Sequence, residues 1–346
     1  MLAPDRRDPV HVAIYTLLDA SALRALWSLY DENSGLTRGD GIAQGSINST
    51  YRLATEAGVF FLRINENKGR EDVWYEAHLL DHLTAAKRDV VTPTIKNTLL
   101  GERFVCIKER AGRPVWAAIF PELPGQDLSG LEVAAAHTQQ VGRFMAGAHH
   151  ALRSFGGGRA NPYGAVPVAC WLEELVRCHA TREVAERLLA VLALVRRRRR
   201  LLPCGVIHGD LFIDNTKWSN GTLAAVFDWE MAGRDHLVLD VVIAINAWCW
   251  RSSPTGSCAF DPPRCQALLE GYQQLRRLAP SERRGLYLEA LLAAVRFTAS
   301  RLRDFEVPRP GRDQVARAFL DYRDFLARLD ALEGLGERGF LRMVGL

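Results

Sequence analysis

Hydrophobic and polar residues follow two successive patterns along this chain. Helical spacing of apolar residues predicts a short helix over 21–31. Apolar runs separated by glycine-containing turns then predict two or three antiparallel strands between residues 41 and 64. Two further apolar runs, at 104–107 and 116–120, are also expected to be strands. The first third of the chain therefore predicts a small antiparallel sheet.

After residue 121 the apolar spacing becomes helical. The segments 137–152 and 171–195 are predicted to be mostly helical, the second with one polar face. Between the two patterns lies Pro-Glu-Leu-Pro-Gly at 121–125, which predicts a stiff connection. A chain of 346 residues can form two compact bodies. We therefore predict an N-terminal lobe over 1–120 and a C-terminal lobe over 121–346.

Composition and charge indicate an ordinary globular protein. Charged residues make up 24% of the chain and hydrophobic residues 48%, and the formal net charge is +4. Such a modest charge argues against a dedicated nucleic-acid binder. The arginine run at 196–200 ends an apolar helical segment, so we interpret it as a solvated helix end that complements the helix dipole. A nucleic-acid site there would instead predict steeply salt-dependent binding.

We expect the protein in the cytoplasm. Its most apolar stretch, 237–250, is interrupted by Asp240 and Asn246 and is too short to cross a bilayer. The first residues contain no apolar segment of the signal-peptide kind. The seven cysteines are scattered without a Cys-x-x-Cys pair, which is typical of reduced thiols and gives no zinc signature.

The candidate chemistry lies in two strand-like runs, 206–215 and 224–230, that each lead into acidic residues. Phosphoryl transfer needs a carboxylate that accepts the proton of the attacking hydroxyl, and oxygen ligands that hold Mg²⁺ against the phosphates. We assign Asp210 as the base and Asn215 and Asp228 as magnesium ligands. A simpler interpretation, two buried strands that end in surface acids, does not explain Asn215 or the order of the elements.

The pattern His208-Gly209-Asp210-x-x-x-x-Asn215, followed by an apolar strand and Asp228, resembles the catalytic core of the aminoglycoside-phosphotransferase branch of the protein-kinase-like fold. This resemblance implies an α+β, bilobal protein-kinase-like fold. The N-lobe would be a small antiparallel sheet that binds nucleotide, and the larger, mainly helical C-lobe would carry catalysis and substrate binding. The implied cofactors are ATP, bound between the lobes, and Mg²⁺.

The same resemblance implies supporting residues around the catalytic stretch. His208 more often braces such a loop than performs chemistry, and we assign it a supporting role. Asp240 resembles a structural aspartate that ties the catalytic loop to the next helix. A buried acid at that position needs hydrogen-bond partners, which fits bracing. His149 or His150 matches a structural histidine at the end of a family helix.

Nucleotide contacts are expected in the predicted sheet. Backbone N–H groups in the turn that contains Gly45, Ser46 and Asn48 would cover the phosphates, although an ordinary hairpin would have the same sequence pattern. Arg63 stands where the family usually has a strand lysine that touches the phosphates. Arg is not equivalent to Lys in reach or shape, and an exposed strand residue is the alternative interpretation.

A glutamate is expected to pair with that strand cation. Glu76 opens a predicted helix and resembles the family residue in this role. Glu71 and Asp72, one turn earlier, are competitors for the same pairing.

The acceptor is indicated by the C-terminal third. The segments 246–249, 268–272 and 290–304, together with the start of the chain, resemble the bacterial homoserine kinases of the phosphotransferase-like type. The resemblance extends from about residue 12 to 311. It implies that the small-molecule substrate is L-homoserine and the product O-phospho-L-homoserine, on the path to threonine. It implies neither a nucleic-acid nor a membrane partner.

Homoserine is a zwitterion with a hydroxyl on a short arm, so its site needs a cation, an acid and the base. Arg296, Arg301 and Arg303 lie on one predicted helical segment, with Arg296 and Arg303 on a shared face. We assign Arg296 and Arg301 to the carboxylate, with a solvated basic face as the alternative. Four acids are candidates for the ammonium group, with Asp214 assigned first: Asp214, Asp240, Glu230 and Asp304.

Two departures from the family pattern keep other functions open. Ala247 stands where the family commonly has an acid, and 47–51 differs from the usual phosphate turn. A different small alcohol, such as an amino alcohol, an aminoglycoside or a sugar, is therefore an alternative acceptor. A polycationic aminoglycoside would favour an acid-rich site, which the arginines at 296–303 do not provide. A silent nucleotide-binding protein is a further alternative, favoured only by Arg63.

Overall fold

The computed structural model describes residues 16–42, 48–86, 90–109, 112–252, 258–307 and 321–346. The chain forms two compact units. The first, which we call the sheet unit, contains the described residues up to Ala77 together with Thr94–Glu122. The second, the helical unit, contains His78–Pro93, Leu123–Val307 and Asp321–Leu346.

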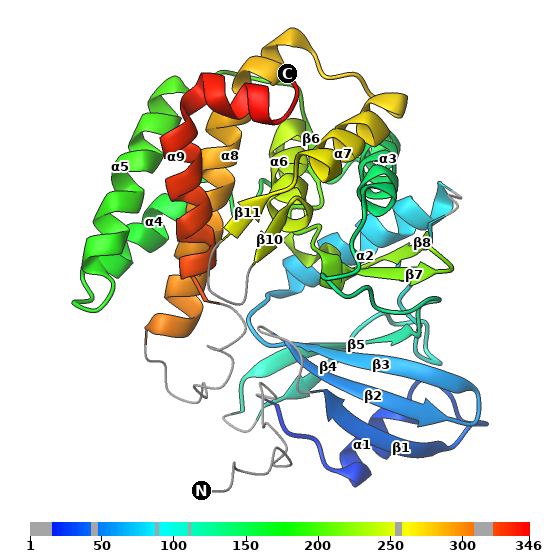
Figure 1. The fold of residues 1–346 in the computed structure, drawn as a ribbon. Coiled ribbons are helices and arrows are strands. Elements are labelled where there is room, and N and C mark those ends of the chain that lie inside the picture. The colour runs from blue at the N-terminus through cyan, green and yellow to red at the C-terminus, as the bar shows by residue number, and fades with distance from the viewer. Residues whose placement is uncertain (1–15, 43–47, 87–89, 110–111, 253–257, 308–320) are drawn as a thin grey trace, which may run out of the picture. The chain divides into compact units, whose positions relative to one another are not determined.

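The sheet unit is built on five antiparallel strands in the order β1-β2-β3-β5-β4, drawn from blue to cyan in Figure 1. The small antiparallel sheet predicted for the first third of the chain is therefore confirmed. Neighbouring strands β2 and β3 are joined through Gly58, whose φ of 129° suits glycine. The strands are β1 (Leu36–Ile42), β2 (Ser49–Thr55), β3 (Gly58–Asn65), β4 (Val105–Lys108) and β5 (Pro114–Pro121).

A short helix covers this sheet and fills its core. Helix α1 (Ala20–Trp27) begins at Asp19, whose carboxylate accepts a hydrogen bond of 2.8 Å from the N–H of Ala22. It is shorter than the predicted 21–31, because the chain turns where the N–H of Tyr30 donates to the carbonyl of Trp27. The apolar face of α1 packs on the inward residues of the strands, among them Leu23, Leu26, Trp27, Leu53, Leu62 and Ile64.

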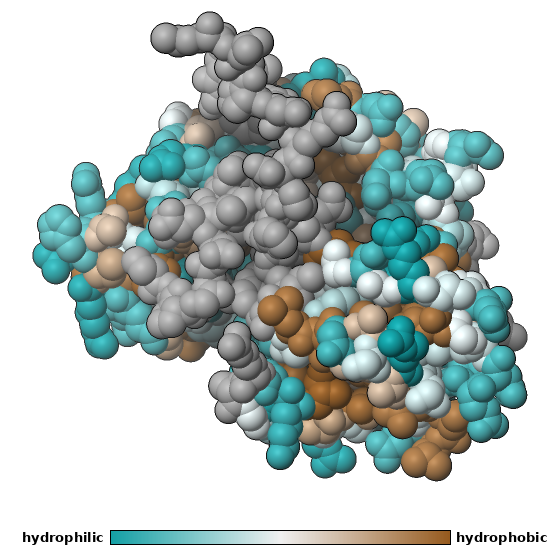
Figure 2. Space-filling model, turned by 90° about the horizontal axis from the view of Figure 1, so that it is seen from below, coloured by the Kyte–Doolittle hydropathy of each residue, from teal (hydrophilic) through white to brown (hydrophobic). Residues whose placement is uncertain are grey.

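The surface drawn in Figure 2 mixes polar residues in teal with apolar residues in brown. Exposed large apolar side chains of the sheet unit include Leu17, Leu29, Leu99 and Leu100. Scattered exposed leucines are ordinary on protein surfaces, so they define no site by themselves.

The helical unit packs long helices around three short two-stranded sheets. In Figure 1, α9 in red lies beside α8 in orange, and α5 in green lies next to α8. Its helices are α3 (Ala135–Ala151), α4 (Ala165–Val176), α5 (Arg182–Arg198), α6 (Leu237–Trp248), α7 (Pro262–Leu275), α8 (Pro280–Arg301) and α9 (Arg323–Met343), and α2 (Arg70–Ala85) begins in the sheet unit and ends here. Its strands are β6 (Cys204–Ile207), β7 (Thr216–Ser219), β8 (Thr222–Val226), β9 (Gly233–His236), β10 (Trp250–Ser252) and β11 (Cys258–Phe260).

The segment predicted as mostly helical at 171–195 belongs to two helices, α4 and α5. The chain turns at 177–181, where the hydroxyl of Thr181 donates a hydrogen bond of 2.7 Å to the carbonyl of Leu175. This bond satisfies one of the carbonyls left open at the end of α4. The apolar pattern continues across the turn because both helices bury one face.

Helices α3 and α7 cross in close contact through two glycines. A Cβ on Gly142 would lie 2.0 Å from the carbonyl oxygen of Leu268, and a Cβ on Gly271 would lie 1.9 Å from that of Gln139. Only residues without a side chain fit at this crossing. The contact sets the separation of His149 on α3 and Tyr272 on α7, which matters for the site described below.

Helix α6 is buried along its whole length of 12 residues. It carries Asp240 and Asn246 into the interior of the helical unit. Among the described residues, no helix is both long and apolar enough to cross a membrane.

Candidate active site

The loop that follows β6 is held by the carboxylate of Asp240. The backbone N–H groups of His208 and Gly209 donate to its two oxygens at 2.9 and 2.8 Å. Nε2 of His149 lies 3.0 Å from the same carboxylate, and Nδ1 of His149 lies 2.9 Å from the hydroxyl of Tyr272. Burial alone would raise the pKa of Asp240, but the hydrogen bond from His149 and the loop donors hold it below its ordinary value. Asp240 and His149 thus have the structural contacts expected for bracing residues.

Gly209 gives this loop its shape. Its φ of 77° lies in the left-handed region, and a Cβ there would stand 3.2 Å from the carbonyl oxygen of Met231. Glycine is the residue that adopts this conformation without strain.

Asp210 follows in a partly enclosed position. The side-chain amide of Asn215 donates to the carbonyl of Asp210 at 2.8 Å and approaches its carboxylate at 3.3 Å. Loss of solvent, with further contributions from the charges of Asp214 and Glu230, raises the pKa of Asp210 to about 7 against the opposing charge of Arg296. A carboxylate with such a pKa is suited to accept a proton near neutral pH.

His208 contacts backbone groups and an aromatic ring in the loop region. Its Nε2 donates to the carbonyl of Phe227 at 3.0 Å, and its Nδ1 accepts from the N–H of Asp210 at 3.2 Å. Its ring packs against Trp229 with centroids 4.5 Å apart. Burial lowers the pKa of His208, so the ring is neutral and links two segments of the site.

A hairpin brings Asn215 next to Asp228. Strands β7 and β8 pair Thr216 with Val226, and the N–H of Phe227 donates to the carbonyl of Asn215 at 3.0 Å. Asp228 has a left-handed backbone with φ of 63°, which is uncommon outside glycine and often found at functional sites. The hairpin therefore gathers an amide oxygen and a carboxylate, the ligand types that Mg²⁺ prefers.

This oxygen pair fits a weakly chelated cation better than a protein-enclosed metal. Among the described residues, no group of three His, Cys, Asp or Glu is arranged to hold a metal ion. Mg²⁺ is commonly bound by one or two protein oxygens with waters and substrate phosphates completing the shell.

The expected ion pair in the sheet unit is present. Nη2 of Arg63 on β3 lies 2.6 Å from a carboxylate oxygen of Glu76 on α2, and the Glu76 side chain is 3% exposed. The guanidinium of Arg63 also lies over the ring of Phe120 at 4.9 Å. Glu76 therefore pairs with Arg63, as expected. Asn48 directly precedes β2, whereas Gly45 and Ser46 lie outside the described residues.

Arg296 occupies a different position from the one expected. It was predicted to face the acceptor carboxylate, but its guanidinium donates to the carbonyl of Gly209 and packs on the rings of Tyr163 and Phe297. With 1% of its surface exposed, Arg296 lies beneath the loop that follows β6 and carries Asp210, which we call the catalytic loop, and supports its backbone. Sequence spacing could not reveal this, because the direction of a buried side chain depends on tertiary packing.

Arg303 faces the same aromatic pair as Arg296, because it packs on Trp171, which contacts the Tyr163 ring beside Arg296. Helix α8 ends at Arg301 and continues as a π-helical turn, Leu302–Glu306, which changes the angular spacing of the following residues. Arg303 pairs with Asp304 at 3.0 Å and packs on Trp171. Of the four acids considered for the ammonium, Asp304 is thus already paired, and Asp240 is occupied by the loop.

Arg301 and Asp214 lie near enough to Asp210 for their charges to interact with its carboxyl. The charge of Arg301 acts on the carboxyls of both aspartates. Its Nη1 donates to the carbonyl of Asp321 at 2.8 Å, and its guanidinium lies over the ring of Phe325 at 4.4 Å. Burial, followed by the charge of Arg328, lowers the pKa of Arg301 to about 10.

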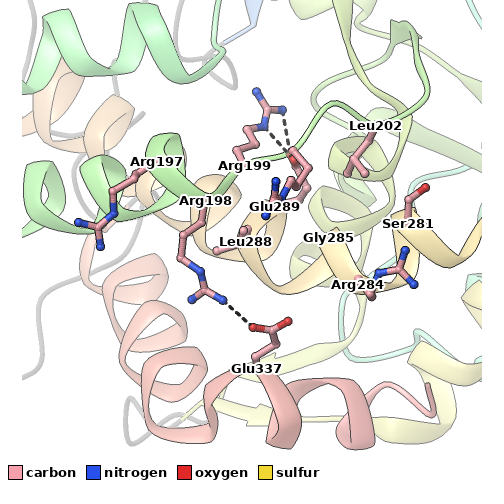
Figure 3. A pocket seen from close by; sticks show the side chains of 11 residues that line it. Arg197, Arg198, Arg199, Leu202, Ser281, Arg284, Gly285, Leu288, Glu289 and Glu337 are labelled. Carbon is pink, nitrogen blue, oxygen red and sulfur yellow. Dashed lines mark hydrogen bonds and ion pairs between the residues drawn. The ribbon is translucent and has the colours of Figure 1, made fainter.

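The arginine run at 196–200 is only partly the solvated helix end that we expected. Arg199 lies just after α5 and bridges Glu289 at 2.8 Å and Asp235 at 2.6 Å. Burial opposes its charge, but these acids raise the pKa of Arg199 above its ordinary value. Figure 3 shows Arg199 directed at Glu289 and Arg198 at Glu337, beside a hollow of about 630 Å³. None of the residues lining this hollow belongs to the predicted catalytic set.

Sequence analysis missed two residues of helix α9. Phe325 is buried against Phe297, and Arg328 is buried with its guanidinium over the Phe325 ring at 4.3 Å. Phe325, Leu329 and Leu332 mark a buried face at helical spacing. The arginine at position 328, on an otherwise apolar face, is the sequence feature that could have identified these residues.

These features define a class of protein. A five-stranded antiparallel sheet unit, a helical unit and a loop with Asp210, Asn215 and Asp228 are the parts of a kinase-like phosphotransferase. Residues 39–278 match the phosphotransferase enzyme family, and the chain belongs to that family.

Two similar proteins are both named as the same kind of kinase. The chain is 36% identical to a homoserine kinase of Gluconacetobacter diazotrophicus, over 92% of this chain and 96% of that protein. It is 31% identical to a homoserine kinase of Bartonella henselae, over 95% of this chain and all of that protein. The recognition of a phosphotransferase-type homoserine kinase family from the sequence is confirmed.

Solved structures have the same fold. The amicoumacin kinase hAmiN, in complex with AMP-PNP, Ca²⁺ and Ami, superposes with a TM-score of 0.67 at 15% identity, over 93% of this chain and 94% of that chain. A microcompartment-associated aminopropanol kinase gives a TM-score of 0.61 at 18% identity, over 94% of this chain and 100% of that chain. The predicted protein-kinase-like α+β fold is therefore confirmed.

Proposed function

We propose that this protein is an ATP-dependent homoserine kinase that forms O-phospho-L-homoserine and ADP from L-homoserine. The observation that carries the proposal is the similarity, over nearly the whole chain, to relatives named homoserine kinase at 31% and 36% identity. The site supports it chemically, because a carboxylate with a raised pKa stands beside two oxygen ligands for a cation.

Asp210 acts as the base in this proposal. The substrate hydroxyl oxygen forms a bond to the γ-phosphorus in line with the leaving oxygen of ADP, and the hydroxyl proton passes to the carboxylate of Asp210. Asn215 keeps that carboxylate oriented, and Asp240, His208 and Arg296 hold the loop backbone. Catalysis then rests on positioning and charge neutralisation, and no covalent intermediate is required.

Asn215 and Asp228 would hold Mg²⁺. The amide nitrogen of Asn215 faces Asp210, which leaves its carbonyl oxygen for a cation. When bound, Mg²⁺ supplies neutralisation of the charge on the nucleotide phosphates.

We assign the binding of the nucleotide phosphates to residues of the sheet unit. Arg63, oriented by Glu76, would contact them as a cation, and backbone N–H groups near Gly45, Ser46 and Asn48 would cover them. The AMP-PNP and Ca²⁺ bound to the amicoumacin kinase support a nucleotide with a divalent cation in this fold.

An acceptor panel tests the proposed function. ADP release with Mg-ATP would be measured against L-homoserine, L-serine, choline, an aminoglycoside and methylthioribose. The proposal predicts a clear preference for L-homoserine in kcat/KM. Equal or better turnover of another acceptor would contradict it while keeping the phosphotransfer chemistry.

An amino alcohol without a carboxylate is the second candidate acceptor. Two observations favour it: Ala247 stands where the family pattern commonly has an acid, and a structural neighbour is an aminopropanol kinase. The position of Arg301 beside Asp210 favours homoserine instead, since an amino alcohol offers no anion to a buried cation.

The cellular location is also part of the proposal. A cytoplasmic enzyme agrees with cysteines that are scattered and form no Cys-x-x-Cys pair. Small-molecule substrates, with no nucleic-acid partner, agree with the modest net charge of +4.

A further inference from the structure

Two arginines pack on one phenylalanine ring near the catalytic loop. Arg301, at the end of α8, lies 4.4 Å from the centroid of the Phe325 ring, and Arg328 on α9 lies 4.3 Å from it. The side chain of Arg301 is 13% exposed and residue Arg328 is 8% exposed. Two guanidinium groups are thus held close to the same ring and largely out of water.

Among the described residues, few close carboxylates balance the charges of this pair. Arg301 lies 3.7 Å from the carboxylate of Asp324, half of whose side chain is exposed. Within the described part of the chain, Arg328 forms no ion pair, and its Nη1 donates to the carbonyl of Asn246 at 2.7 Å. Buried cations without a close anion are costly and are usually found paired.

Buried donors without an acceptor occur in the same neighbourhood. Nε of Arg328 has no hydrogen-bond partner among the described residues, and neither has the side-chain amide nitrogen of Asn246. Asn246 is 2% exposed, and its backbone carbonyl accepts the hydrogen bond from Arg328. Both atoms are hydrogen-bond donors, so a water molecule or an anion would satisfy them.

The arginine pair adjoins the reacting carboxylate. Phe212, two residues after Asp210, packs on Phe297 at 5.0 Å and on Phe325 at 6.1 Å. Phe297 and Phe325 stack at 4.9 Å with 27° between their planes. The loop that carries Asp210 and the start of α9 are therefore joined through one aromatic cluster, which places the two arginines in the neighbourhood of that loop.

We infer that Arg301 and Arg328 bind the carboxylate of the acceptor, so that the enzyme selects hydroxylated amino acids over amino alcohols. This inference rests on the proposed phosphotransfer to a small alcohol and deepens it by naming the substrate class. Guanidinium groups suit the task, because they match a carboxylate with two parallel hydrogen bonds. Phe325 keeps both guanidinium planes in place.

The preference for an acceptor with a carboxylate follows from the charges of the two arginines, which an acceptor without a carboxylate would leave unpaired. Removal of the carboxylate from L-homoserine gives 3-aminopropan-1-ol, which keeps the hydroxyl and the ammonium. That molecule would leave both buried arginines without an anion. A site built around polar groups discriminates strongly against an analogue that leaves them unpaired.

The test pairs these two acceptors with substitutions of Arg328. Values of kcat/KM would be measured for L-homoserine and 3-aminopropan-1-ol in the wild type, in Arg328→Met and in Arg338→Ala. Methionine keeps an unbranched side chain for packing without the charge, and thermal unfolding checks that the variant folds. Arg338 is an exposed arginine on the same helix and serves as the matched control.

We expect Arg328→Met to lower kcat/KM for L-homoserine by about 100-fold, as for loss of one member of a buried charge pair. The value for 3-aminopropan-1-ol should stay within about threefold of wild type, because that acceptor makes no use of the arginine. Arg338→Ala should change neither value. An equal fall for both acceptors, or no fall for homoserine, would overturn the inference.

Failure of the proposed function gives a different result. Wild-type enzyme that ignores homoserine but phosphorylates another hydroxy acid, with loss of that activity in Arg328→Met, would overturn homoserine as substrate and keep the carboxylate site. Wild-type enzyme that turns over only acceptors without a carboxylate would overturn both.

Discussion

At the scale of single residues, the catalytic loop depends on one buried carboxylate. Asp240 accepts the backbone N–H groups of His208 and Gly209 and is itself held by His149. The loop residues therefore keep their positions through an interaction that involves no substrate. Removal of one member of such a buried, hydrogen-bonded charged group strongly destabilises the folded protein.

Asp240→Asn should lower the free energy of unfolding by about 3 kcal/mol at pH 7, because it leaves loop donors and His149 without their shared anion. The pKa of Asp240 is below its ordinary value of 3.8 in the folded protein. Its ionised form therefore stabilises the fold fully above pH 3.8, and this contribution is lost as the pH falls through the lower folded value.

Urea unfolding at pH 7 and at the lowest pH where both proteins fold would measure this difference. The gap between wild type and variant should be constant near neutrality and narrow only in strong acid. The exposed Glu173→Gln substitution on α4 is a suitable control. A gap that widens on acidification would contradict the role assigned to Asp240.

Contacts that depend on local spacing could be predicted from the sequence, and those that depend on packing could not. Asp210 and Asn215 are close because both lie on one short loop. The choice of Glu76 over its competitors required the structure, since all three lie on the first turns of α2. Arg199 was expected in a solvated helix end and Arg296 at the acceptor carboxylate. The carboxylate partner of Arg199 and the carbonyl partner of Arg296 depend on tertiary packing, which local spacing does not reveal.

At the scale of elements, the contact of α3 with α7 supports the site from a distance. The two helices approach through Gly142 and Gly271, and this spacing allows His149 to meet both Tyr272 and Asp240. Helix packing is thereby connected to the position of the catalytic loop.

Gly271→Ala should lower the free energy of unfolding by about 2 kcal/mol, because its Cβ would lie 1.9 Å from the carbonyl oxygen of Gln139 and the helices must separate. We also expect a lower kcat, since the displacement reaches His149. Gly334→Ala on α9, where a Cβ meets nothing within 4 Å, should instead be neutral or slightly stabilising. Chemical denaturation of the three proteins compares them directly, and equal stability of the two variants would refute the crossing as described.

The elements themselves were largely predictable, but their ends and continuity were not. Alternating apolar runs identified the strands of the sheet unit. The division between α4 and α5 was not foreseen, because both helices bury the same kind of face. The π-helical turn after Arg301 was also unforeseen.

At the scale of the whole molecule, the chain divides its chemistry between two units. The sheet unit holds the Arg63–Glu76 pair, and the helical unit holds the catalytic loop and the arginines at Phe325. The bilobal organisation was expected from length and from the change of apolar pattern after residue 121. The contact of α9 with the loop of Asp210 was harder to predict, because α9 lies more than 100 residues beyond Asp210 in the sequence and meets this loop only in the fold.

We propose above all that Asp210 serves phosphoryl transfer to a small alcohol. The most direct measurement is steady-state turnover of L-homoserine with Mg-ATP by wild type and Asp210→Asn, together with the dissociation constant of ATP for each. We predict that the variant loses about 1,000-fold in kcat, as expected for removal of a general base, while its affinity for ATP stays within about threefold. An Asp210→Asn enzyme that turns over at the wild-type rate would contradict the account.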